Sequence, residues 1–344
     1  MSDRNLQVLL KARPSGAPRE SDFSCVESPM PRIGAGQFLM RNLYLSIDAG
    51  FRQWMNEGAG DGYLQAMALN EPVMGLVLGE VIESRHSDYA IGELIMGRTR
   101  WESYSVADGT EYMAKMATVD AGVPLSAYLG ILGPTGLTAY FGMRDVGQPC
   151  SGESVLVSTA AGAVGSVAAQ IARIRGCRTV GLTSTDEKCR WLVDELGLDA
   201  AINYRQPGGL EAGLARHFPD GVDVYFDNVG GRTLDTVLAH LRSGARIVLC
   251  GALAAYNESE PVPGPYNMFK IITQRATVKG FMVTDYVAEY PAAIQQLTTW
   301  LKQGRLKNAE EVVLGVENTA AAFCRMFAGG NRGKLVVRVN GTEV

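Results

Sequence analysis

The small residues of Ala160–Ser166 could bring backbone amides close to an anionic ligand. They read Ala-Ala-Gly-Ala-Val-Gly-Ser and follow the apolar run at 155–158. In a strand–turn–helix unit, such a turn lets N–H groups approach a pyrophosphate, which then lies at the positive end of the helix. Ala160 stands in the first position of the usual Gly-x-Gly-x-x-Gly pattern, and Gly162 and Gly165 fill the other two. We predict a dinucleotide site formed by Ala161, Gly162, Ala163, Val164 and Gly165.

The residues after the second predicted strand bear on which dinucleotide this site would take. An acidic side chain about 20 residues after the glycines normally binds the ribose of NAD. Thr183 and Ser184 stand there instead, and Lys188 follows one helical turn later. A carboxylate would repel a 2′-phosphate, whereas hydroxyls can donate to it and a lysine adds positive charge. This pattern favours NADPH over NADH; the alternative is that Ser184 and Glu187 form a capping box.

The predicted turn belongs to a stretch in which strands and helices alternate. Six runs are predicted as strands, at 155–158, 179–183, 201–204, 222–226, 246–250 and 278–283. Runs with helical spacing of apolar residues lie at 162–175, 186–196, 208–218 and 233–241. This alternation predicts an α/β domain over residues 129–300, with a doubly wound parallel sheet covered on both faces.

The first part of the chain is patterned differently. Short β-rich runs at 37–46, 75–84 and 93–98 are broken by glycine and proline. They predict a mostly antiparallel, barrel-like domain over residues 1–128. The run at 334–339 is again rich in β-branched residues, so we expect residues 301–344 to return to the first domain.

Composition restricts the class of protein. The 344 residues are 47% hydrophobic and 20% charged, with a net charge of −4. A sizeable core can therefore form, and no binding to nucleic acid or to a membrane is expected. No apolar run is long enough to span a bilayer and the N-terminus lacks a signal-peptide core, so we expect a cytoplasmic protein. The six cysteines and three histidines show no metal-ligand spacing, and no metal is expected.

Eight short motifs occur in the order typical of one known family. They are Leu45–Asp48, Gly133–Tyr140, Ala160–Ser166, Asp186–Lys188, Ile202–Tyr204, Tyr225–Gly231, Ala255–Asn257 and Asn331–Lys334. Together they resemble the zinc-independent branch of the medium-chain dehydrogenase/reductase superfamily, and within it the prostaglandin reductase, or leukotriene B4 dehydrogenase, family. Plant double-bond reductases and bacterial curcumin reductases belong to that family. The resemblance covers nearly the whole chain.

The resemblance implies a Rossmann domain and a β-rich, GroES-like catalytic domain, in a subunit that usually forms a homodimer. It implies NADPH-dependent reduction of the C=C bond of small α,β-unsaturated ketones and aldehydes. Lys188 and Tyr204 would contact the 2′-phosphate, and Asn228 and Asn331 would lie near the cofactor. The other cofactor-binding residues that it implies are Pro134, Thr135, Cys250, Gly251, Tyr256, Phe281, Met282 and Val283.

Tyr256 is the candidate catalytic residue. Reduction of an activated C=C bond needs a hydride, which nicotinamide supplies, and a hydrogen-bond donor for the enolate oxygen. A phenol is neutral and protonated at working pH, and Tyr256 follows the fifth predicted strand, where ligands of such sheets bind. The structural alternative is a loop tyrosine bonded to a backbone carbonyl; the resemblance favours the catalytic role.

Structural interpretations of the other motifs stay open. Tyr204 could cover the core, Asn331–Gly333 could be a turn, and Asp227–Gly230 could be a helix cap. Structural roles are expected for Tyr44, Tyr63 and Trp101. The family usually carries Asp-Pro-Tyr-Met-Arg where this chain has Asp48–Arg52, reading Asp-Ala-Gly-Phe-Arg; this departure bears on the range of substrates.

Three other functions also stay open. An NADPH quinone oxidoreductase would share the fold. A cofactor-binding protein without catalysis could serve as a lens-type structural protein or an RNA binder, although the acidic balance argues against RNA. A zinc alcohol dehydrogenase is disfavoured because the ligand clusters are missing from the sequence pattern.

Overall fold

The computed structural model describes residues 4–59, 65–116, 119–258, 260 and 262–339, so Tyr63 lies outside the described residues. The chain divides into two compact units. Unit 1 comprises Met1–Leu129, Glu310–Asn331 and Leu335–Val344, and unit 2 comprises Gly130–Ala309 and Arg332–Lys334. Unit 2 thus extends beyond the expected boundary at residue 300 and includes a separate piece of three residues.

Unit 2 is built on a six-stranded parallel sheet. Its strands are β8 (Ser154–Val157), β9 (Arg178–Thr183), β10 (Ala200–Asn203), β11 (Val222–Asp227), β12 (Leu241–Leu249) and β13 (Thr277–Gly280). They lie in the order β10-β9-β8-β11-β12-β13, and every neighbouring pair is parallel. This confirms the predicted doubly wound Rossmann sheet, in which the strand order reverses between β8 and β11.

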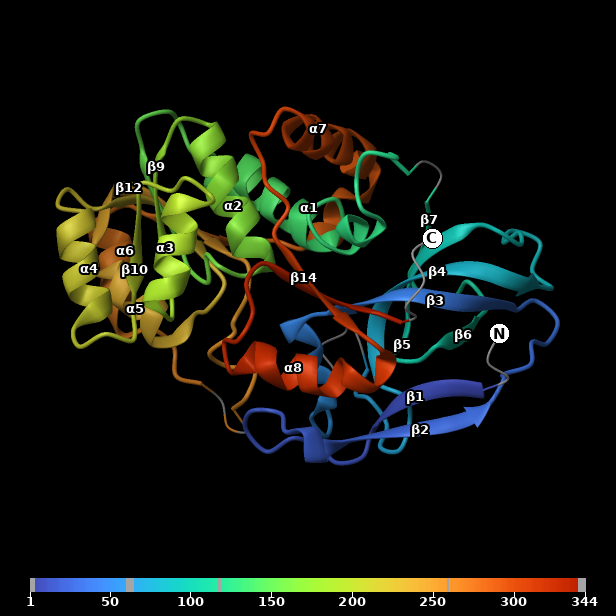
Figure 1. Ribbon diagram of the computed structural model, residues 1–344. Coiled ribbons are helices and arrows are strands. Elements are labelled where there is room, and N and C mark those ends of the chain that lie inside the picture. Colours follow the sequence, from blue (N-terminus) through green and yellow to red (C-terminus); the bar gives the residue numbers. More distant parts are fainter. Residues whose placement is uncertain (1–3, 60–64, 117–118, 259, 261, 340–344) are drawn as a thin grey trace. The chain divides into compact units, whose positions relative to one another are not determined.

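Helices cover both faces of this sheet. The helices in the described part of unit 2 are α1 (Pro134–Phe141), a π-helix (Gly142–Gly147), α2 (Ala163–Ile174), α3 (Asp186–Asp194), α4 (Gly209–His217), α5 (Gly231–Leu238), η5 (Tyr266–Met268), α6 (Phe269–Thr273), η6 (Val283–Glu289) and α7 (Tyr290–Lys302) (Figure 1). Leu182 of β9 packs in one buried cluster with Leu214 of α4 and Val237 of α5. Its neighbour Gly181 instead faces Leu192 of α3. Because side chains alternate along a strand, α3 lies on the face opposite α4 and α5.

The predicted helix at 233–241 is wrong at its C-terminal end. Helix α5 stops at Leu238, and Leu241 already pairs with Val222 in the sheet. Leu238 and Leu241 are both buried, so the apolar spacing of a helix continues into the strand. Spacing alone could not reveal the change, because the strand forms through pairing with β11, which lies outside the helical run.

Unit 1 contains a seven-stranded sheet and a separate hairpin. The sheet has the order β14-β15-β3-β4-β5-β7, with β6 paired to β3. Its strands are β3 (Phe38–Ile47), β4 (Met74–Ser84), β5 (Leu94–Arg100), β6 (Tyr104–Ala107), β7 (Met113–Lys115), β14 (Glu310–Leu314) and β15 (Lys334–Arg338). The pairs of β3 with β15, β4 and β6, and of β5 with β4 and β7, are antiparallel. The C-terminal strand β15 therefore pairs directly with β3.

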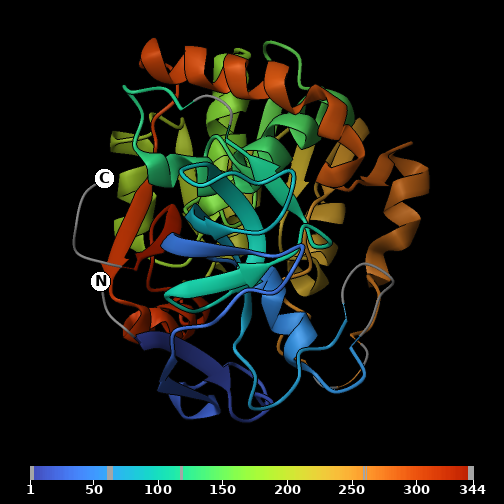
Figure 2. The same cartoon turned by 90° about the vertical axis from the view of Figure 1, so that its right-hand side faces the viewer.

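The hairpin and several short helices complete unit 1. The hairpin consists of β1 (Arg4–Leu10) and β2 (Phe23–Pro29), drawn in dark blue in Figure 2. The helices are η1 (Glu20–Asp22), η2 (Ala49–Met55), η3 (Leu125–Leu129), η7 (Val316–Asn318) and α8 (Thr319–Phe327). The backbone N–H of Val8 donates to the carbonyl oxygen of Trp101 at 2.9 Å, which joins the hairpin to the segment between β5 and β6.

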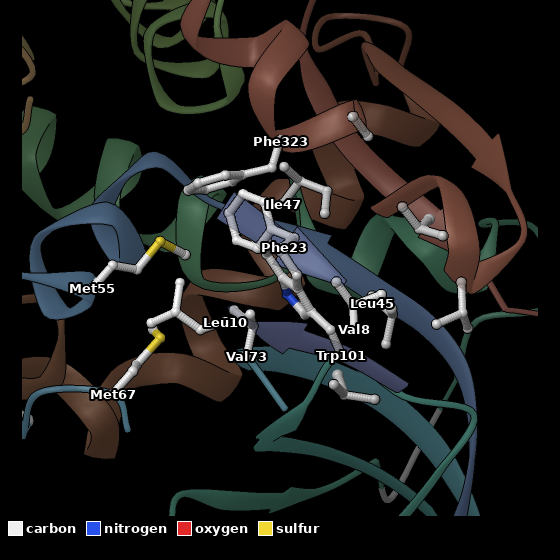
Figure 3. Packing of buried hydrophobic residues seen from close by; sticks show 14 of the residues in the cluster. Val8, Leu10, Phe23, Leu45, Ile47, Met55, Met67, Val73, Trp101 and Phe323 are labelled. Carbon is white, nitrogen blue, oxygen red and sulfur yellow. The ribbon is translucent and has the colours of Figure 1, made fainter. Parts of the chain in front are cut away.

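An aromatic cluster forms the core of unit 1 (Figure 3). Trp101 is 1% exposed, and its ring centroid lies 6.0 Å from that of Phe23 and 5.3 Å from that of Phe323. Trp101 thus occupies the structural position expected from the sequence. Tyr44 packs against a smaller cluster of the same unit. Gly75 faces the indole, because an added Cβ there would lie 2.5 Å from Nε1 of Trp101.

A buried carboxyl group also ties the hairpin to this sheet. Oε2 of Glu102 accepts hydrogen bonds from Asn5 Nδ2 at 3.0 Å and from Gln7 Nε2 at 2.6 Å. Oε1 accepts from the hydroxyl of Ser105 at 2.9 Å. Burial raises the pKa of Glu102, and the three donors oppose that rise only in part.

Candidate cofactor and active site

The turn between β8 and α2 has the close backbone packing that a pyrophosphate site requires. Thr159 adopts a left-handed conformation with φ of +50°, and its carbonyl oxygen accepts from the N–H of Gly162 at 2.8 Å. Gly162 is the N-cap of α2. A Cβ added at Gly165 would lie 2.2 Å from the Thr159 carbonyl oxygen. Only glycine lets the helix start approach the turn this closely, so the turn fits the phosphate-binding role.

The alanine in the first position of the motif has a packing explanation. Ala160 is fully buried, and its N–H donates to the carbonyl oxygen of Leu182 at 2.9 Å. Its Cβ would lie 2.7 Å from a Cβ added at Gly181. The methyl group of Ala160, in the turn after β8, therefore occupies the space that the missing side chain on β9 leaves. The left-handed residue of this turn is Thr159, so position 160 does not require glycine.

Polar side chains join the carboxyl ends of β8 and β11, where the strand order reverses. Asn228 donates from its backbone N–H to Ser158 Oγ at 2.8 Å and from Nδ2 to the Ser158 carbonyl oxygen at 2.7 Å. Oδ1 of Asp227 accepts from the hydroxyl of Tyr225 at 2.7 Å and from the N–H of Gly230 at 3.0 Å. Burial raises the pKa of Asp227, although these hydrogen bonds act to lower it. Asp227 thus holds the turn just before α5, whose N-cap is Gly230 and has no side-chain capping bond.

The carboxyl end of β12 is attached to the same point. The backbone N–H of Cys250 donates to the Asp227 carbonyl oxygen at 2.8 Å, and that of Gly251 donates to it at 3.2 Å. Burial, followed by the nearby Asp227 carboxylate, raises the pKa of Cys250 to about 12. Cys250 is therefore a neutral thiol at neutral pH.

Tyr256 turns its hydroxyl back toward the end of β12. The hydroxyl accepts from the backbone N–H of Ala252 at 3.3 Å, and a Cβ added at Gly251 would lie 3.3 Å from it. The expected alternative, a hydroxyl donating to a backbone carbonyl, is not what these contacts describe. Burial raises the pKa of Tyr256, and the bond from Ala252 only partly offsets the rise. The phenol is thus a neutral group whose proton can be donated.

Residues expected at the 2′-phosphate lie at, or shortly after, the carboxyl ends of β9 and β10. Thr183 ends β9, and its carbonyl oxygen accepts from the N–H of Tyr204 at 3.1 Å. Ser184 follows Thr183, and both side chains are buried. Tyr204 is 45% exposed, so it does not cover the core. Lys188 lies in the first turn of α3.

The alternative interpretation of Ser184 and Glu187 as a capping box is wrong. The N-cap of α3 is Thr185, whose Oγ1 accepts from the backbone N–H of Lys188 at 3.2 Å. Consecutive Ser184 and Thr185 are both good caps, and the sequence does not distinguish them. The structure leaves the Ser184 hydroxyl outside the cap.

The remaining expected residues lie on α1 and after β13. Pro134 is the first residue of α1, and the hydroxyl of Thr135 donates to the Gly130 carbonyl oxygen at 3.0 Å. The predicted strand at 278–283 is too long, because β13 ends at Gly280. Phe281, Met282 and Val283 therefore follow the strand at its carboxyl end, and Met282 is exposed. Phe281 packs beside Gly142, where an added Cβ would lie 2.8 Å from the ring.

Sequence reasoning missed the role of the segment Arg332–Lys334. Gly162 and Gly333 form a parallel β-bridge, and the N–H of Gly333 donates to the Ala161 carbonyl oxygen at 2.8 Å. Arg332 Nη1 lies 3.5 Å from Glu187 Oε1. The Asn-Arg-Gly-Lys motif was the available signal, but the resemblance implies a cofactor contact only for Asn331, which belongs to unit 1.

The altered segment Asp48–Arg52 lies in unit 1 at η2. Arg52 is buried and donates to the carbonyl oxygens of Pro14 and Gly16, both at 2.9 Å. Its role is therefore to hold the neighbouring loop. A Cβ added at Gly50 would meet nothing within 4 Å, so this position borders open space.

The described residues also bear on metal ions and membranes. No group of three or more His, Cys, Asp or Glu within these residues could hold a metal ion. None of the helices described is long and apolar enough to cross a membrane.

Comparisons with known proteins cover nearly the whole chain. Residues 6–114 match a family described as the N-terminal domain of oxidoreductase, and residues 163–299 match a family described as zinc-binding dehydrogenase. The 2-alkenal reductase (NADP(+)-dependent) of Nicotiana tabacum is 39% identical over 98% of both chains. Prostaglandin reductase 1 of Rattus norvegicus is 37% identical over 96% of this chain and 97% of its own. A crystal structure of CurA in complex with NADPH, from Vibrio vulnificus, superposes with a TM-score of 0.90 at 35% identity, covering 98% of this chain and 100% of that one.

Proposed function

We propose that this chain, which belongs to the prostaglandin reductase family of the zinc-independent medium-chain dehydrogenase/reductases, uses NADPH to reduce the C=C bond of α,β-unsaturated ketones and aldehydes. The observation that carries the proposal is the neutral Tyr256 phenol at the carboxyl end of β12. The relatives named as alkenal and prostaglandin reductases support the same reaction class. The absence of a carboxylate at Thr183 and Ser184 supports NADPH over NADH.

Different residues of this chain would bind different parts of the cofactor. The turn at Ala161–Gly165 would hold the pyrophosphate, and Thr183, Ser184, Lys188 and Tyr204 the 2′-phosphate. Expected at the rest of the cofactor are Pro134, Thr135, Asn228, Cys250, Gly251, Phe281, Met282, Val283 and Asn331. Bound NADPH supplies a hydride for the β-carbon of the substrate.

Tyr256 would stabilise the negative charge that develops on the substrate oxygen. Its hydroxyl accepts a bond from the Ala252 N–H, and this polarises the O–H toward an acceptor on the other side. The raised pKa keeps the proton on the phenol at neutral pH. A preorganised donor of this kind is worth about 3 kcal/mol in the transition state.

The test is Tyr256→Phe, assayed for NADPH oxidation with a small enone and for formation of the saturated ketone. We expect kcat to fall about 100-fold because one transition-state donor is lost, while the Kd for NADP+ stays unchanged. Tyr128→Phe is the matched control, since the Tyr128 hydroxyl also accepts a backbone N–H, that of Asp120, at 3.0 Å. Full turnover by Tyr256→Phe would refute the assigned role.

Product analysis separates the proposal from the quinone alternative. A quinone oxidoreductase would form hydroquinone and leave enones and enals untouched. Failure of enones and enals of varied size to accelerate NADPH loss would refute the reductase assignment as a whole. Tight NADPH binding without turnover of either acceptor would favour a cofactor-binding protein without catalysis.

The proposal includes a homodimer in the cytoplasm that binds neither nucleic acid nor membranes. Strand β13 lies at the edge of its sheet, and Tyr266, Met268, Phe269 and Ile272, shortly before it, are exposed. Exposed apolar side chains beside an open edge suit pairing with a second copy. The six cysteines are free, as is usual for a reducing compartment.

A further inference from the structure

We propose that Arg332 recognises the 2′-phosphate of the bound dinucleotide, with Glu187 as the neighbour whose charge it neutralises. The inference rests on the proposed use of NADPH. It adds a charged residue from the C-terminal part of the chain to a site otherwise built from the Rossmann core.

The position of Arg332 follows from the backbone on either side of the glycine turn. Gly333 bonds to Ala161 at 2.8 Å, in the turn after β8. The Arg332 guanidinium reaches Glu187, in the first turn of α3 after β9, at 3.5 Å. Arg332 therefore connects the carboxyl ends of β8 and β9. In a Rossmann sheet the adenosine ribose lies between these two ends.

The backbone around Arg332 is also fixed. Gly333 has φ of +65°, and a Cβ added there would lie 2.0 Å from the Ala309 carbonyl oxygen. That oxygen accepts from the N–H of Lys334 at 2.8 Å. Because the segment is held by Ala161 on one side and Ala309 on the other, the side chain of Arg332 starts from a defined point.

The acidic residues at the start of α3 explain why a positive charge at Arg332 would matter for phosphate binding. Helix α3 begins with Asp186 and Glu187, and both would repel a phosphate. Oδ1 of Asp186 accepts from the side-chain amides of Asn203 and Gln206, each at 2.8 Å. Glu187 is paired with Arg332. An arginine fork can bind a carboxylate and a phosphate oxygen at once, so Arg332 can make this edge attractive to the 2′-phosphate.

Substitution of Arg332 is expected to leave the fold intact. The side chains of Arg332 and Glu187 are 45% and 71% exposed, and exposed ion pairs contribute little to stability. Arg325→Gln is a matched control. Arg325 pairs with Glu311 at 2.8 Å and its side chain is 43% exposed, but it lies in α8 of unit 1.

The experiment is calorimetric titration with 2′,5′-ADP and with 5′-ADP, which lack the nicotinamide. In Arg332→Gln we expect at least about tenfold weaker binding of 2′,5′-ADP, the effect of losing one charge-assisted hydrogen bond, and unchanged binding of 5′-ADP. Adding Glu187→Gln should restore part of the lost affinity, because the carboxylate left unpaired then no longer repels the phosphate. Arg325→Gln should bind both nucleotides as the unsubstituted protein does.

Three outcomes would contradict the inference or its premise. Equal weakening of both nucleotides in Arg332→Gln would mean that Arg332 supports the turn only. Retained preference for 2′,5′-ADP in that variant would refute the inference but leave the proposed function standing. No preference for 2′,5′-ADP in the unsubstituted protein would refute the proposed use of NADPH itself.

Discussion

Gly165 and Ala160 belong to the same motif, but different contacts explain the residue type at each position. Gly165 is required by the 2.2 Å approach of its missing Cβ to the Thr159 carbonyl oxygen. Ala160 is tolerated because its backbone is not left-handed and its methyl group fills the space above Gly181. A motif written only as glycines and gaps does not separate these two reasons.

Gly165→Ala should therefore disturb the site, whereas Ala160→Gly should not. Overpacking at Gly165 is expected to cost about 1–3 kcal/mol of stability and to weaken NADP+ binding as α2 shifts from the turn. Ala160→Gly should cost about 1 kcal/mol of stability through a small void and added backbone freedom and leave the Kd for NADP+ nearly unchanged. Thermal unfolding and fluorescence titration measure both quantities. Normal NADP+ binding by Gly165→Ala would contradict the packing argument.

The strands of the parallel sheet were predictable where their burial requires a run of apolar residues in the local sequence. Strand β8 is apolar over Val155–Val157 and β11 over Val224–Phe226, because strands covered on both faces need apolar residues. The end of α5, the cap at Thr185 and the role of Arg332 were not predictable. Each depends on pairing with another segment of the chain or on a choice between adjacent, chemically similar residues.

The attachment of the hairpin β1–β2 should depend on pH through Glu102. The pKa of Glu102 in the folded protein lies above its unfolded value. Its contribution to the free energy of unfolding is therefore fully present below the unfolded carboxyl pKa of about 4.3. It is lost as pH rises through the folded pKa. Glu102→Gln cannot ionise, so the difference in urea midpoint between pH 4 and pH 8 should be smaller than in the unsubstituted protein.

Glu111→Gln is the control for that measurement. Glu111 pairs with Arg98 at 3.1 Å and its side chain is 59% exposed, so its removal should leave the pH dependence of the midpoint unchanged. If Glu102→Gln showed the same pH dependence as the unsubstituted protein, the carboxyl would not be the titrating group.

At the scale of the whole molecule, the proposed homodimer can be tested at the edge of the unit 2 sheet. Phe269 is 70% exposed near β13, and an aspartate there would place charge in the contact. By light scattering we expect twice the 37.0 kDa chain mass for the unsubstituted protein and the single-chain mass for Phe269→Asp. Ile91→Asp, at an apolar position 68% exposed in the turn between β4 and β5, should remain dimeric. A single-chain mass without substitution would refute the dimer.

The protonated thiol of Cys250 has a consequence for an enzyme that handles reactive alkenes. Unsaturated ketones and aldehydes alkylate proteins by addition to thiolates, and a thiol that keeps its proton is a poor nucleophile. Burial beside Asp227 raises the pKa of Cys250 to about 12, so almost no thiolate exists there at neutral pH. The carboxyl end of β12 is thereby protected against covalent inactivation by the compounds that the protein is proposed to consume.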